Sequence, residues 1–268
     1  MDIGRVFRDL HTARGAFVIP NPWDVGSAKF LASLGFKALA TTSAGHAFSR
    51  GKPDGGVSFH DMIAHCREMV AATDLPVSAD LESGKGDSPE SAEETIFAAE
   101  AAGLAGCSIE DATGDPDRPI YEFDLAVERV AAAAAAAKSL DRDFVFTARA
   151  ENYLHGRPDI VDTIARLQAY ERAGADVVYA PGLREIATIK KVCASVSCPV
   201  NVLASAAFSV EQLAGAGAKR ISLGSLLSNS VYRFIKDAAA EMQKDGSFTF
   251  ATGAVPHRQL QALMSRGK

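Results

Sequence analysis

Short apolar runs alternate with longer segments of helical period along most of this chain. The apolar runs, such as 16–19, 75–80 and 106–110, end at polar or turn-forming residues, as buried strands do. The longer segments place apolar residues at helical spacing and carry helix boundary signals. Pro89 stands at a first-turn position and Gly103 follows the last turn of the same segment. The alternation predicts repeated strand–helix units.

The pattern contains eight strand–helix steps. Strands are predicted at 16–19, 37–41, 75–80, 106–110, 143–149, 176–179, 199–203 and 220–223. Helices are predicted at 24–34, 58–72, 89–102, 123–140, 159–173, 183–193 and 210–215, with two more at 226–242 and 256–264. Residues 42–56, which contain Gly and Ser, are predicted to form a loop.

A similar phrase recurs where helices give way to strands, at 102–107, 173–177 and 216–220. Each copy supplies a glycine that can end the helix and then begins a continuous apolar run, which is typical of parallel strands buried on both faces. These features predict a (β/α)8 barrel, a single domain over residues 1–268 with extra C-terminal helices. A doubly wound open sheet is the alternative. In such barrels the chemistry lies at the carboxyl ends of the strands.

Composition narrows the class of protein. The 268 residues are 47% apolar and 23% charged, as in ordinary globular proteins, and the net charge is −5 with a pI near 5.7. Lysines and arginines are scattered, which argues against nucleic-acid binding. No apolar run reaches about 18 residues and no basic segment precedes an apolar core at the N-terminus, so neither membrane spanning nor secretion is predicted and a cytoplasmic protein is expected. The cysteines lack zinc-type spacing and are expected to be free thiols: Cys66, Cys107, Cys193 and Cys198.

The stretch 77–86 carries the first candidate chemistry. Asp80 and Glu82 stand two residues apart at the end of an apolar run that Gly84 and Gly86 then break. Residues two apart in a strand project to the same face, so both carboxylates point one way, which favours a site for a hard cation. An acid that caps the following helix, with a glycine turn, is the alternative interpretation.

Other predicted strand ends add further polar groups. They are Asn21 and Asp24, Ser43 to His46, Glu110 and Asp111, Arg149 and Glu151, and Asn201. Several carboxylates in one barrel mouth would repel one another and protonate unless a cation compensated them. Oxygen ligands without His or Cys favour Mg²⁺, or Mn²⁺, over zinc.

Three segments carry a resemblance to a known family: Ala-Asp-Leu-Glu-Ser-Gly at 79–84, Ser-Ile-Glu-Asp at 108–111 and Thr-Ala-Arg-Ala-Glu at 147–151. In this order and spacing they resemble the isocitrate lyase and phosphoenolpyruvate mutase superfamily, and the resemblance extends from residue 21 to residue 201. It implies a Mg²⁺-dependent site for a small 2-oxo acid. In that site Asp80 resembles the direct metal ligand, and Glu82 and Glu110 act largely through metal-bound water.

The same resemblance assigns the substrate contacts. Arg149 resembles the residue that holds a substrate carboxylate, a task that suits the guanidinium fork. Asp54 matches an acid on the family's mobile gating loop, and Asn201 matches a pocket position. The backbone amides around Ser43, Ala44 and Gly45 are expected to bind a carboxylate or a developing enolate oxygen.

The segment after Glu110 departs from the best-known members. Isocitrate and methylisocitrate lyases carry a Lys-Cys-Gly-His type segment there, whereas residues 110–121 read Glu-Asp-Ala-Thr-Gly-Asp-Pro-Asp-Arg-Pro-Ile-Tyr. The lysine and asparagine of the longer phosphonate mutase lid are not matched either. We therefore predict a lyase that cleaves a carbon–carbon bond in a small 2-oxo acid or dicarboxylate through an enolate. The alternatives are a phosphonate-type mutase or hydrolase, and a catalytically silent 2-oxo acid binder.

Some residues have two readings. His46 is a candidate acid–base group or a plain loop residue, and Arg118 and Tyr121 either replace the missing lid chemistry or face solvent. Trp23 either walls the pocket or anchors the core, whereas His155 is predicted to lie away from the site. Glu151 is expected to orient Arg149 through its i+2 spacing. The resemblance also implies a homo-oligomer, a dimer or tetramer, in which the last barrel helix is exchanged between subunits.

Overall fold

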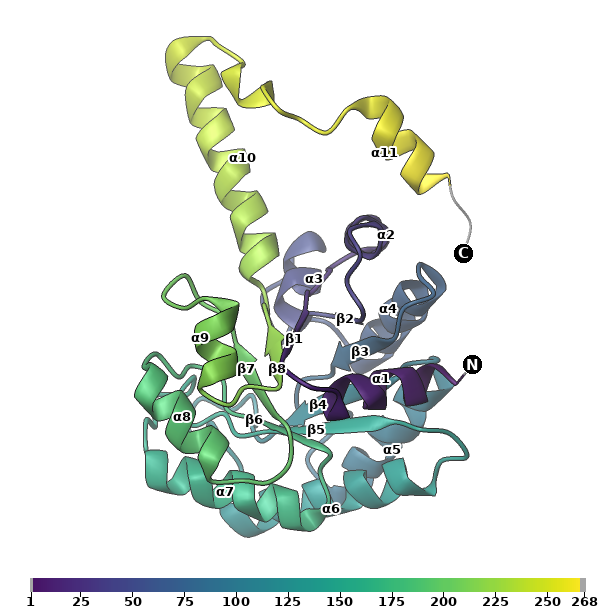
Figure 1. Ribbon diagram of the computed structural model, residues 1–268, viewed down its shortest axis with the longest axis vertical. Coiled ribbons are helices and arrows are strands. Elements are labelled where there is room, and N and C mark those ends of the chain that lie inside the picture. The colour runs from purple at the N-terminus through teal and green to yellow at the C-terminus, as the bar shows by residue number, and fades with distance from the viewer. Residues whose placement is uncertain (1, 266–268) are drawn as a thin grey trace.

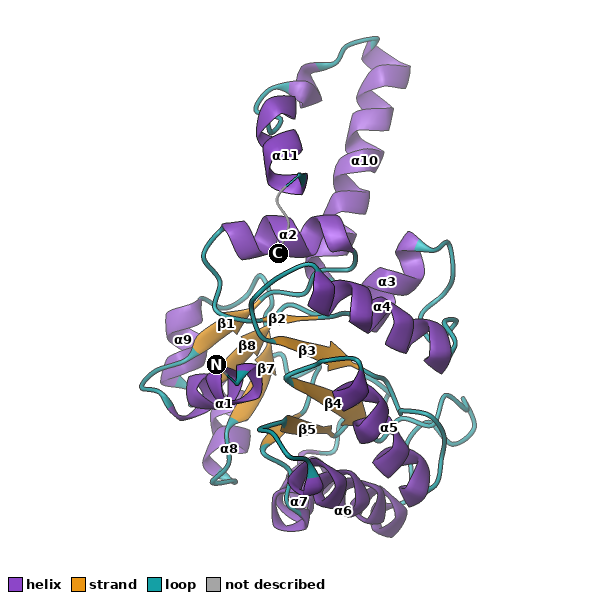
Figure 2. Cartoon of the chain, turned by 90° about the vertical axis from the view of Figure 1, so that its right-hand side faces the viewer, coloured by secondary structure: helices purple, strands orange, loops and turns teal. Residues whose placement is uncertain are grey.

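The computed structural model describes residues 2–265, which form a barrel of parallel strands surrounded by helices, with a C-terminal helical arm (Figures 1 and 2). The strands are β1 (Phe17–Ile19), β2 (Leu39–Ala40), β3 (Val77–Asp80), β4 (Gly106–Glu110), β5 (Val145–Arg149), β6 (Val177–Tyr179), β7 (Val200–Leu203) and β8 (Arg220–Ser222). The helices are α1 (Ile3–Thr12), α2 (Val25–Ser33), α3 (Ser43–Ser49), α4 (Phe59–Ala71), α5 (Pro89–Ala101), α6 (Phe123–Ser139), α7 (Ile160–Ala173), α8 (Ile186–Ala194), α9 (Val210–Gly215), α10 (Leu226–Asp245) and α11 (His257–Met264), with a 3₁₀ turn, η1, at Thr249–Ala251.

The eight strands close into a barrel. Their hydrogen-bonded order is β1-β8-β7-β6-β5-β4-β3-β2, and every pair is parallel. The two outer strands of this order meet through the amide of Ala40, which donates to the carbonyl of Pro20 at 3.1 Å, and through Asn21 Nδ2, which donates to the carbonyl of Thr41 at 2.9 Å. The prediction of a (β/α)8 barrel is confirmed, and the open-sheet alternative is wrong.

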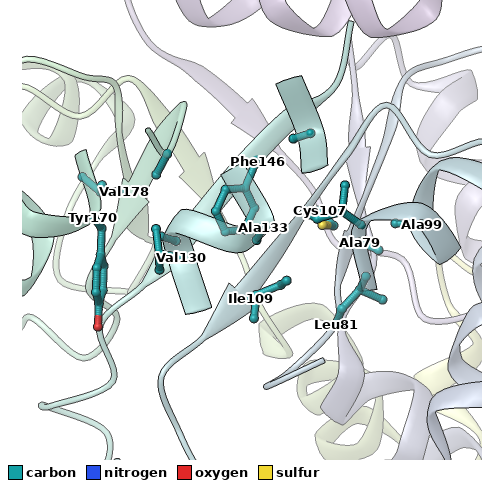
Figure 3. Close-up of a cluster of buried hydrophobic side chains, with 14 of the residues drawn as sticks. Ala79, Leu81, Ala99, Cys107, Ile109, Val130, Ala133, Phe146, Tyr170 and Val178 are labelled. Atoms are coloured by element: carbon teal, nitrogen blue, oxygen red, sulfur yellow. The ribbon is translucent and has the colours of Figure 1, made fainter. Parts of the chain in front are cut away.

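Alternate strand residues face opposite sides of the barrel wall. On β4 and β5, Cys107, Ile109 and Phe146 point toward the surrounding helices and join the main hydrophobic core, where they meet Val130 and Ala133 of α6 (Figure 3). Each such buried side chain contributes about 1.5–3 kcal/mol if it is large. The residues between them face the lumen. Because consecutive positions take opposite faces, the lumen receives only every second side chain, and many of these are polar.

The amino-terminal end of the barrel is plugged by α1. Phe7 is fully buried in a second apolar cluster together with the inward residues Ile19, Ala38, Val145 and Val177. Asp2 caps the helix by accepting the amide of Gly4 at 2.9 Å. This helix was not predicted from the sequence. With α1 below, the lumen opens only toward the carboxyl ends of the strands.

The chain ends in an arm that extends from the barrel, formed by α10, η1 and α11 (Figure 1). Its last helix returns beside α2, where Lys29 Nζ donates to the carbonyl of Met264 at 3.3 Å. Large apolar side chains are exposed along the arm: Val231, Tyr232, Phe234, Ile235, Met242 and Phe248. The predicted C-terminal helices are therefore confirmed. Within residues 2–265 no helix has the length and apolar character needed to cross a membrane.

Two local predictions have different outcomes. Residues 43–49, expected to be a loop, form α3, whose cap residue Thr42 accepts the amide of Gly45 at 3.3 Å. The segment is too short and too rich in small residues to show a helical period. The four cysteines are free thiols, as predicted, with Cys66 and Cys107 buried and the other two half-buried.

Candidate active site

A cavity of about 650 Å³ opens at the carboxyl ends of the strands, and every strand contributes a residue to its wall. All but one of the residues to which the sequence analysis gave a metal, substrate or gating role lie in this wall. They are Ser43, Ala44, Asp54, Asp80, Glu82, Glu110, Arg149 and Asn201. The exception is Gly45, which is buried in α3 and whose amide is already donated to the Thr42 hydroxyl. The barrel thus brings the predicted groups into one cavity.

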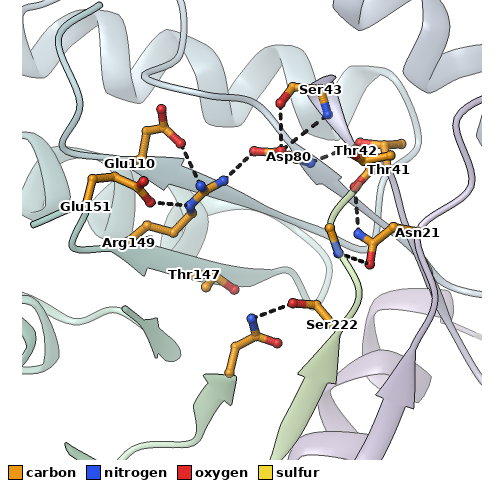
Figure 4. A network of polar contacts seen from close by, with 12 residues as sticks. Asn21, Thr41, Thr42, Ser43, Asp80, Glu110, Thr147, Arg149, Glu151 and Ser222 are labelled. Carbon is orange, nitrogen blue, oxygen red and sulfur yellow. Dashed lines mark hydrogen bonds and ion pairs between the residues drawn. The ribbon is translucent and has the colours of Figure 1, made fainter. Parts of the chain in front are cut away.

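Arg149 is the centre of the polar network in this cavity (Figure 4). Its Nη1 contacts Asp80 Oδ1 at 2.6 Å, its Nη2 contacts Glu110 Oε2 at 2.9 Å, and its Nε contacts Glu151 Oε1 at 2.9 Å. The three acids come from β3, β4 and the segment after β5, and β4 pairs with β5 so that Glu110 lies directly beside Arg149. The predicted contact between Glu151 and Arg149 is present.

The charges of this network do not cancel, because three carboxylates share one guanidinium. Burial would lower the pKa of Arg149, but Glu110, Glu151 and Asp80 outweigh it and hold the pKa well above its usual value. Burial raises the pKa of Glu110 well above its usual range, and the neighbouring acids add to this although Arg149 opposes it. The network therefore has an excess of acid that a bound cation would relieve.

Asp80 also joins the network to the start of α3. Its Oδ2 accepts the Ser43 hydroxyl at 2.8 Å and the Ser43 amide at 3.3 Å, and its own amide donates to Thr41 Oγ1 at 3.0 Å (Figure 4). Both carboxylate oxygens are therefore occupied, one by Arg149 and one by Ser43. The carboxylate has a fixed position at the end of β3.

Glu82 and Asp54 complete the acidic wall next to Asp80. Glu82 has a backbone φ of 51°, a left-handed conformation that is uncommon for a residue other than glycine. Burial raises the pKa of Glu82 to about 7, with further contributions from Asp80 and Asp54. Burial and then Asp80 also raise the pKa of Asp54. Each acid thus disfavours ionisation of the next.

This donor set fits a hard divalent cation in its chemistry, because Asp80, Glu82 and Glu110 offer only oxygen atoms. In the described part of the chain no three acid, His or Cys side chains are grouped closely enough to ligate one ion together. Asp80 and Glu110 bind Arg149 instead. Metal binding would therefore require these two carboxylates to exchange the guanidinium for the ion.

Asp111 is not part of the cavity wall, contrary to the prediction that it converges on the mouth with Glu110. Its Oδ2 accepts Tyr170 Oη at 2.6 Å and Arg166 Nη1 at 3.0 Å, and its Oδ1 accepts the amide of Glu151 at 2.8 Å. It follows Glu110 by one residue, so the alternation of the strand sends it toward α7. Its effect on the site passes through Glu151, whose backbone it fixes.

The lid residues after β4 do not supply the missing chemistry. The Tyr121 hydroxyl donates to Asp87 at 2.6 Å, and its ring lies 4.5 Å from the guanidinium of Arg129. Arg129 in turn donates to the carbonyls of Ser83 and Gly86. Arg118 is exposed and pairs with Asp115 at 3.2 Å. Tyr121 therefore fixes the loop after β3, and the solvent-exposed reading of Arg118 is the correct one.

Histidines occupy positions different from those expected. His46 is buried in α3 and stacks on His65 with ring centroids 3.7 Å apart, outside the main cavity. His155, predicted to lie away from the site, lines the cavity. Trp23 does not line it, and Asp24 caps α2 by accepting the amide of Ser27 at 2.6 Å. Of the two polar groups predicted after the first strand, Asn21 lines the cavity and Asp24 does not.

Among the cavity residues that were not singled out from the sequence are three with polar side chains on the last three strands: Tyr179, Arg220 and Ser222. Each lies on the inward face of its strand, at the same side as the predicted Asn201. A usable signal existed, because a charged residue inside the apolar run 220–223 is unusual for a strand buried on both faces. Reading each strand in steps of two from its polar end would have identified all three.

A family model for phosphoenolpyruvate phosphomutase matches residues 7–243 of this chain. The chain belongs to the phosphoenolpyruvate mutase and isocitrate lyase superfamily. An uncharacterized protein of Mycobacterium tuberculosis (strain ATCC 25618 / H37Rv) is 31% identical over 259 residues, which cover 96% of this chain and 95% of that protein.

Two solved structures extend the family comparison. A protein of Burkholderia cenocepacia J2315, assigned provisionally as a lyase or mutase, is 51% identical with a TM-score of 0.95, and the match covers 98% of this chain and 96% of that one. Oxaloacetate acetylhydrolase in complex with its product oxalate is 25% identical with a TM-score of 0.86, covering 97% and 93%. The superfamily therefore includes both lyases and mutases on this barrel.

Proposed function

We propose that this superfamily member is a Mg²⁺-dependent lyase that cleaves a carbon–carbon bond next to the enolisable carbon of a small 2-oxo acid. The observation that carries the proposal is the network of Asp80, Glu110 and Arg149 in one cavity at the strand ends. It places carboxylates that suit a divalent cation beside a guanidinium that suits the carboxylate of a substrate. One relative named for its reaction, oxaloacetate acetylhydrolase, supports a 2-oxo acid as substrate.

Asp80 would hold the ion directly, with Glu82 and Glu110 on its water shell. When bound, Mg²⁺ would polarise the carbonyl and carboxylate oxygens of a 2-oxo acid and stabilise the enolate that remains after bond cleavage. The three acids supply the negative charge that such an ion requires. Burial, and then the neighbouring acids, raise the pKa of Glu82 and of Glu110, which reflects the energetic cost of holding these two charges in the cavity without a cation.

Arg149 would bind the substrate carboxylate. Asp80 and Glu110 each take one N–H bond on the two Nη atoms of Arg149, so one N–H bond on each Nη remains for a substrate carboxylate. Glu151 stays behind it on Nε and keeps the plane of the guanidinium in place. Asp54, whose pKa is raised by burial and by Asp80, is the acid we assign to hold a proton near the reacting atoms, because Asp80, Glu82 and Glu110 are assigned to the ion.

The lid favours this chemistry over that of the better-known branches. Among the described residues that line the cavity there is no cysteine and no lysine. The acid–base cysteine of the isocitrate lyase type and the lid lysine of the phosphonate mutase type therefore have no counterpart in the wall. Bond cleavage that needs only an enolate sink, such as decarboxylation or retro-aldol scission, remains compatible with the groups present.

Turnover of oxaloacetate, isocitrate, methylisocitrate and phosphonopyruvate, followed by NMR with and without Mg²⁺, tests the proposal. We expect Mg²⁺-dependent cleavage of a carbon–carbon bond and its loss in Asp80→Ala. Asp141→Asn, which removes an exposed carboxylate away from the cavity, is the matched control and should retain activity. Cleavage of phosphonopyruvate alone would show a phosphonate enzyme. Binding of oxalate, with no product formed from any of the four compounds, would show a silent binder.

We also propose that the C-terminal arm mediates homo-oligomerisation. Several apolar side chains of the arm are exposed in the single chain, and three of them are more than half exposed: Phe234, Ile235 and Phe248. Such a concentration of exposed apolar groups is typical of an interface. Light scattering should show a dimer or tetramer, and Phe234→Asp combined with Ile235→Asp should shift it toward the monomer.

A further inference from the structure

Arg220 lies in the lumen of the barrel and lines the cavity, yet no predicted role involves it. It is 5% exposed and projects inward from the start of β8. Its Nη2 donates to Thr147 Oγ1 at 3.0 Å. Thr147 shares the inward face of β5 with Arg149 and lies two residues deeper (Figure 4). The guanidinium of Arg220 therefore forms part of the cavity floor, because the backbone of Thr147 lies about 7 Å deeper along β5 than that of Arg149.

The two guanidiniums of the cavity have opposite surroundings. Arg149 touches three carboxylates, whereas the side-chain partners of Arg220 are all neutral: Asn201 Oδ1 at 2.9 Å, Thr147 Oγ1 and His11 Nε2 at 3.4 Å. His11 is neutral because burial, and then the charge of Arg220, lower its pKa to about 3. Its Nδ1 donates to the carbonyl of Phe7 at 2.9 Å, which leaves Nε2 as the acceptor that faces Arg220. In the described part of the chain Arg220 forms no ion pair. An arginine in this position is a buried positive charge without a counter-ion.

The hydrogen-bond geometry leaves Arg220 able to donate to another partner. A guanidinium carries two N–H bonds on each Nη atom, and the neutral acceptors take one bond on each. Its contact with Asn201 also fixes that side chain, because an arginine can only donate. Asn201 must therefore present its oxygen to Arg220 and its Nδ2 to Ser222 Oγ at 2.9 Å. The floor of the cavity is accordingly lined by donors.

We propose that Arg220 is a specificity-determining residue that makes the cavity floor a site for the second carboxylate of a dicarboxylic 2-oxo acid. The inference rests on the proposed function, since the first carboxylate is the one held near Arg149. An unpaired guanidinium with free N–H bonds is a better partner for an anion than for the apolar end of a monocarboxylic acid, whose burial there would leave the charge unsatisfied. The charge of the floor thus selects between substrates that share the 2-oxo carboxylate group.

Calorimetric binding of matched 2-oxo acids in saturating Mg²⁺ tests this. The pairs are oxaloacetate with 2-oxobutyrate and 2-oxoglutarate with 2-oxovalerate, which differ by a carboxylate in place of a methyl group. We expect the parent protein to favour the dicarboxylate at least about tenfold in one pair, and Arg220→Met to reduce that preference to less than about threefold. Oxalate, which carries no distal group, should bind both proteins within about threefold. Arg142→Met, which removes a partly buried arginine away from the cavity, should retain the preference.

Oxalate separates the two levels of the proposal. If oxalate shows no Mg²⁺-dependent binding to the parent, the proposed function fails and this inference fails with it. If oxalate binds but neither pair shows a preference in the parent, or Arg220→Met keeps the parental preference, only the role of Arg220 is overturned. Arg220→Lys, which keeps the charge, carries the same test if the methionine variant does not fold. It should retain a weakened preference, and the absence of any preference together with normal oxalate binding contradicts the proposal.

Discussion

Asp111 offers a direct test of the distinction between site residues and the scaffold behind them. Both of its carboxylate oxygens accept hydrogen bonds, from Arg166, Tyr170 and the amide of Glu151. Asp111→Ala leaves the buried guanidinium of Arg166 without this partner, a change that costs about 3–5 kcal/mol in comparable cases. Arg166 retains Asp162 at 2.9 Å, so we expect the lower end, about 3 kcal/mol.

The expected change in melting temperature follows from the size of the chain. An unfolding entropy of about 2.1 cal/mol/K per residue over 268 residues gives about 0.6 kcal/mol/K, so a loss of about 3 kcal/mol lowers the Tm by about 5 °C. Asp111→Asn should be nearly as damaging, because its NH₂ group must face one of the three donors. Differential scanning calorimetry measures both variants.

The control is Asp9→Ala, which removes an exposed i,i+4 partner of Arg5 and should shift the Tm by less than about 1 °C. If Asp111→Asn has the same Tm as the parent protein but binds Mg²⁺ more weakly, the structural role that we assign to Asp111 is wrong. Asp111 would then belong with the acids that line the cavity. Equal Tm values for Asp111→Ala and Asp9→Ala would lead to the same conclusion.

Three further outcomes are expected. Because burial raises the pKa of Glu82 to about 7, protons compete with Mg²⁺ below that pH, and calorimetry should show affinity falling by up to about tenfold per pH unit, a dependence that Glu82→Gln should weaken. Burial lowers the pKa of His65 to about 4, so the unfolded chain gains a proton below about pH 6.5 that the folded chain does not. Urea denaturation should show stability lost as the pH falls from 6.5 to 4, and His65→Phe should lack about 3 kcal/mol of that loss. Gly4→Ala would place its Cβ 1.7 Å from the Asp143 carbonyl oxygen and should destabilise the protein by at least about 2 kcal/mol in the same assay, whereas Gly215→Ala meets open space and should be neutral or slightly stabilising.

The barrel could be predicted because its signals are local and repeated. Each unit carries its own helix terminators and apolar strand, and Ser88 with Pro89 or Asp159 with the following helix shows that the caps act where the pattern placed them. Helices α1 and α3 were missed for different reasons. α3 is one short segment of small residues, and α1 stands outside the repeat, so neither adds to the alternation that carries the prediction.

The side of the barrel that each acid faces follows from alternation, but its partner does not. Glu110 and Asp111 are adjacent in sequence, and the strand sends one to the cavity and the other to α7. The choice between a cation and Arg149 as the partner of Asp80 depends on distances across three strands, which no local pattern encodes. The inward position of Arg220 could have been predicted from its strand, but its neutral partners could not, since they come from β5, β7 and α1.

The polar lumen explains how this fold can keep its stability while changing its substrate. Barrels of this class usually fill their interior with branched apolar side chains. Here the apolar packing lies outside the strand wall and below it, around α1, and the upper lumen is a polar cavity. Burial disfavours the charged forms of residues such as Glu82 and Arg220 there, and it raises the pKa of Glu82 and lowers that of Arg220. Apolar packing in the surrounding core offsets the free-energy cost of burying these groups, so replacing them should alter ligand selectivity more than the stability of the barrel.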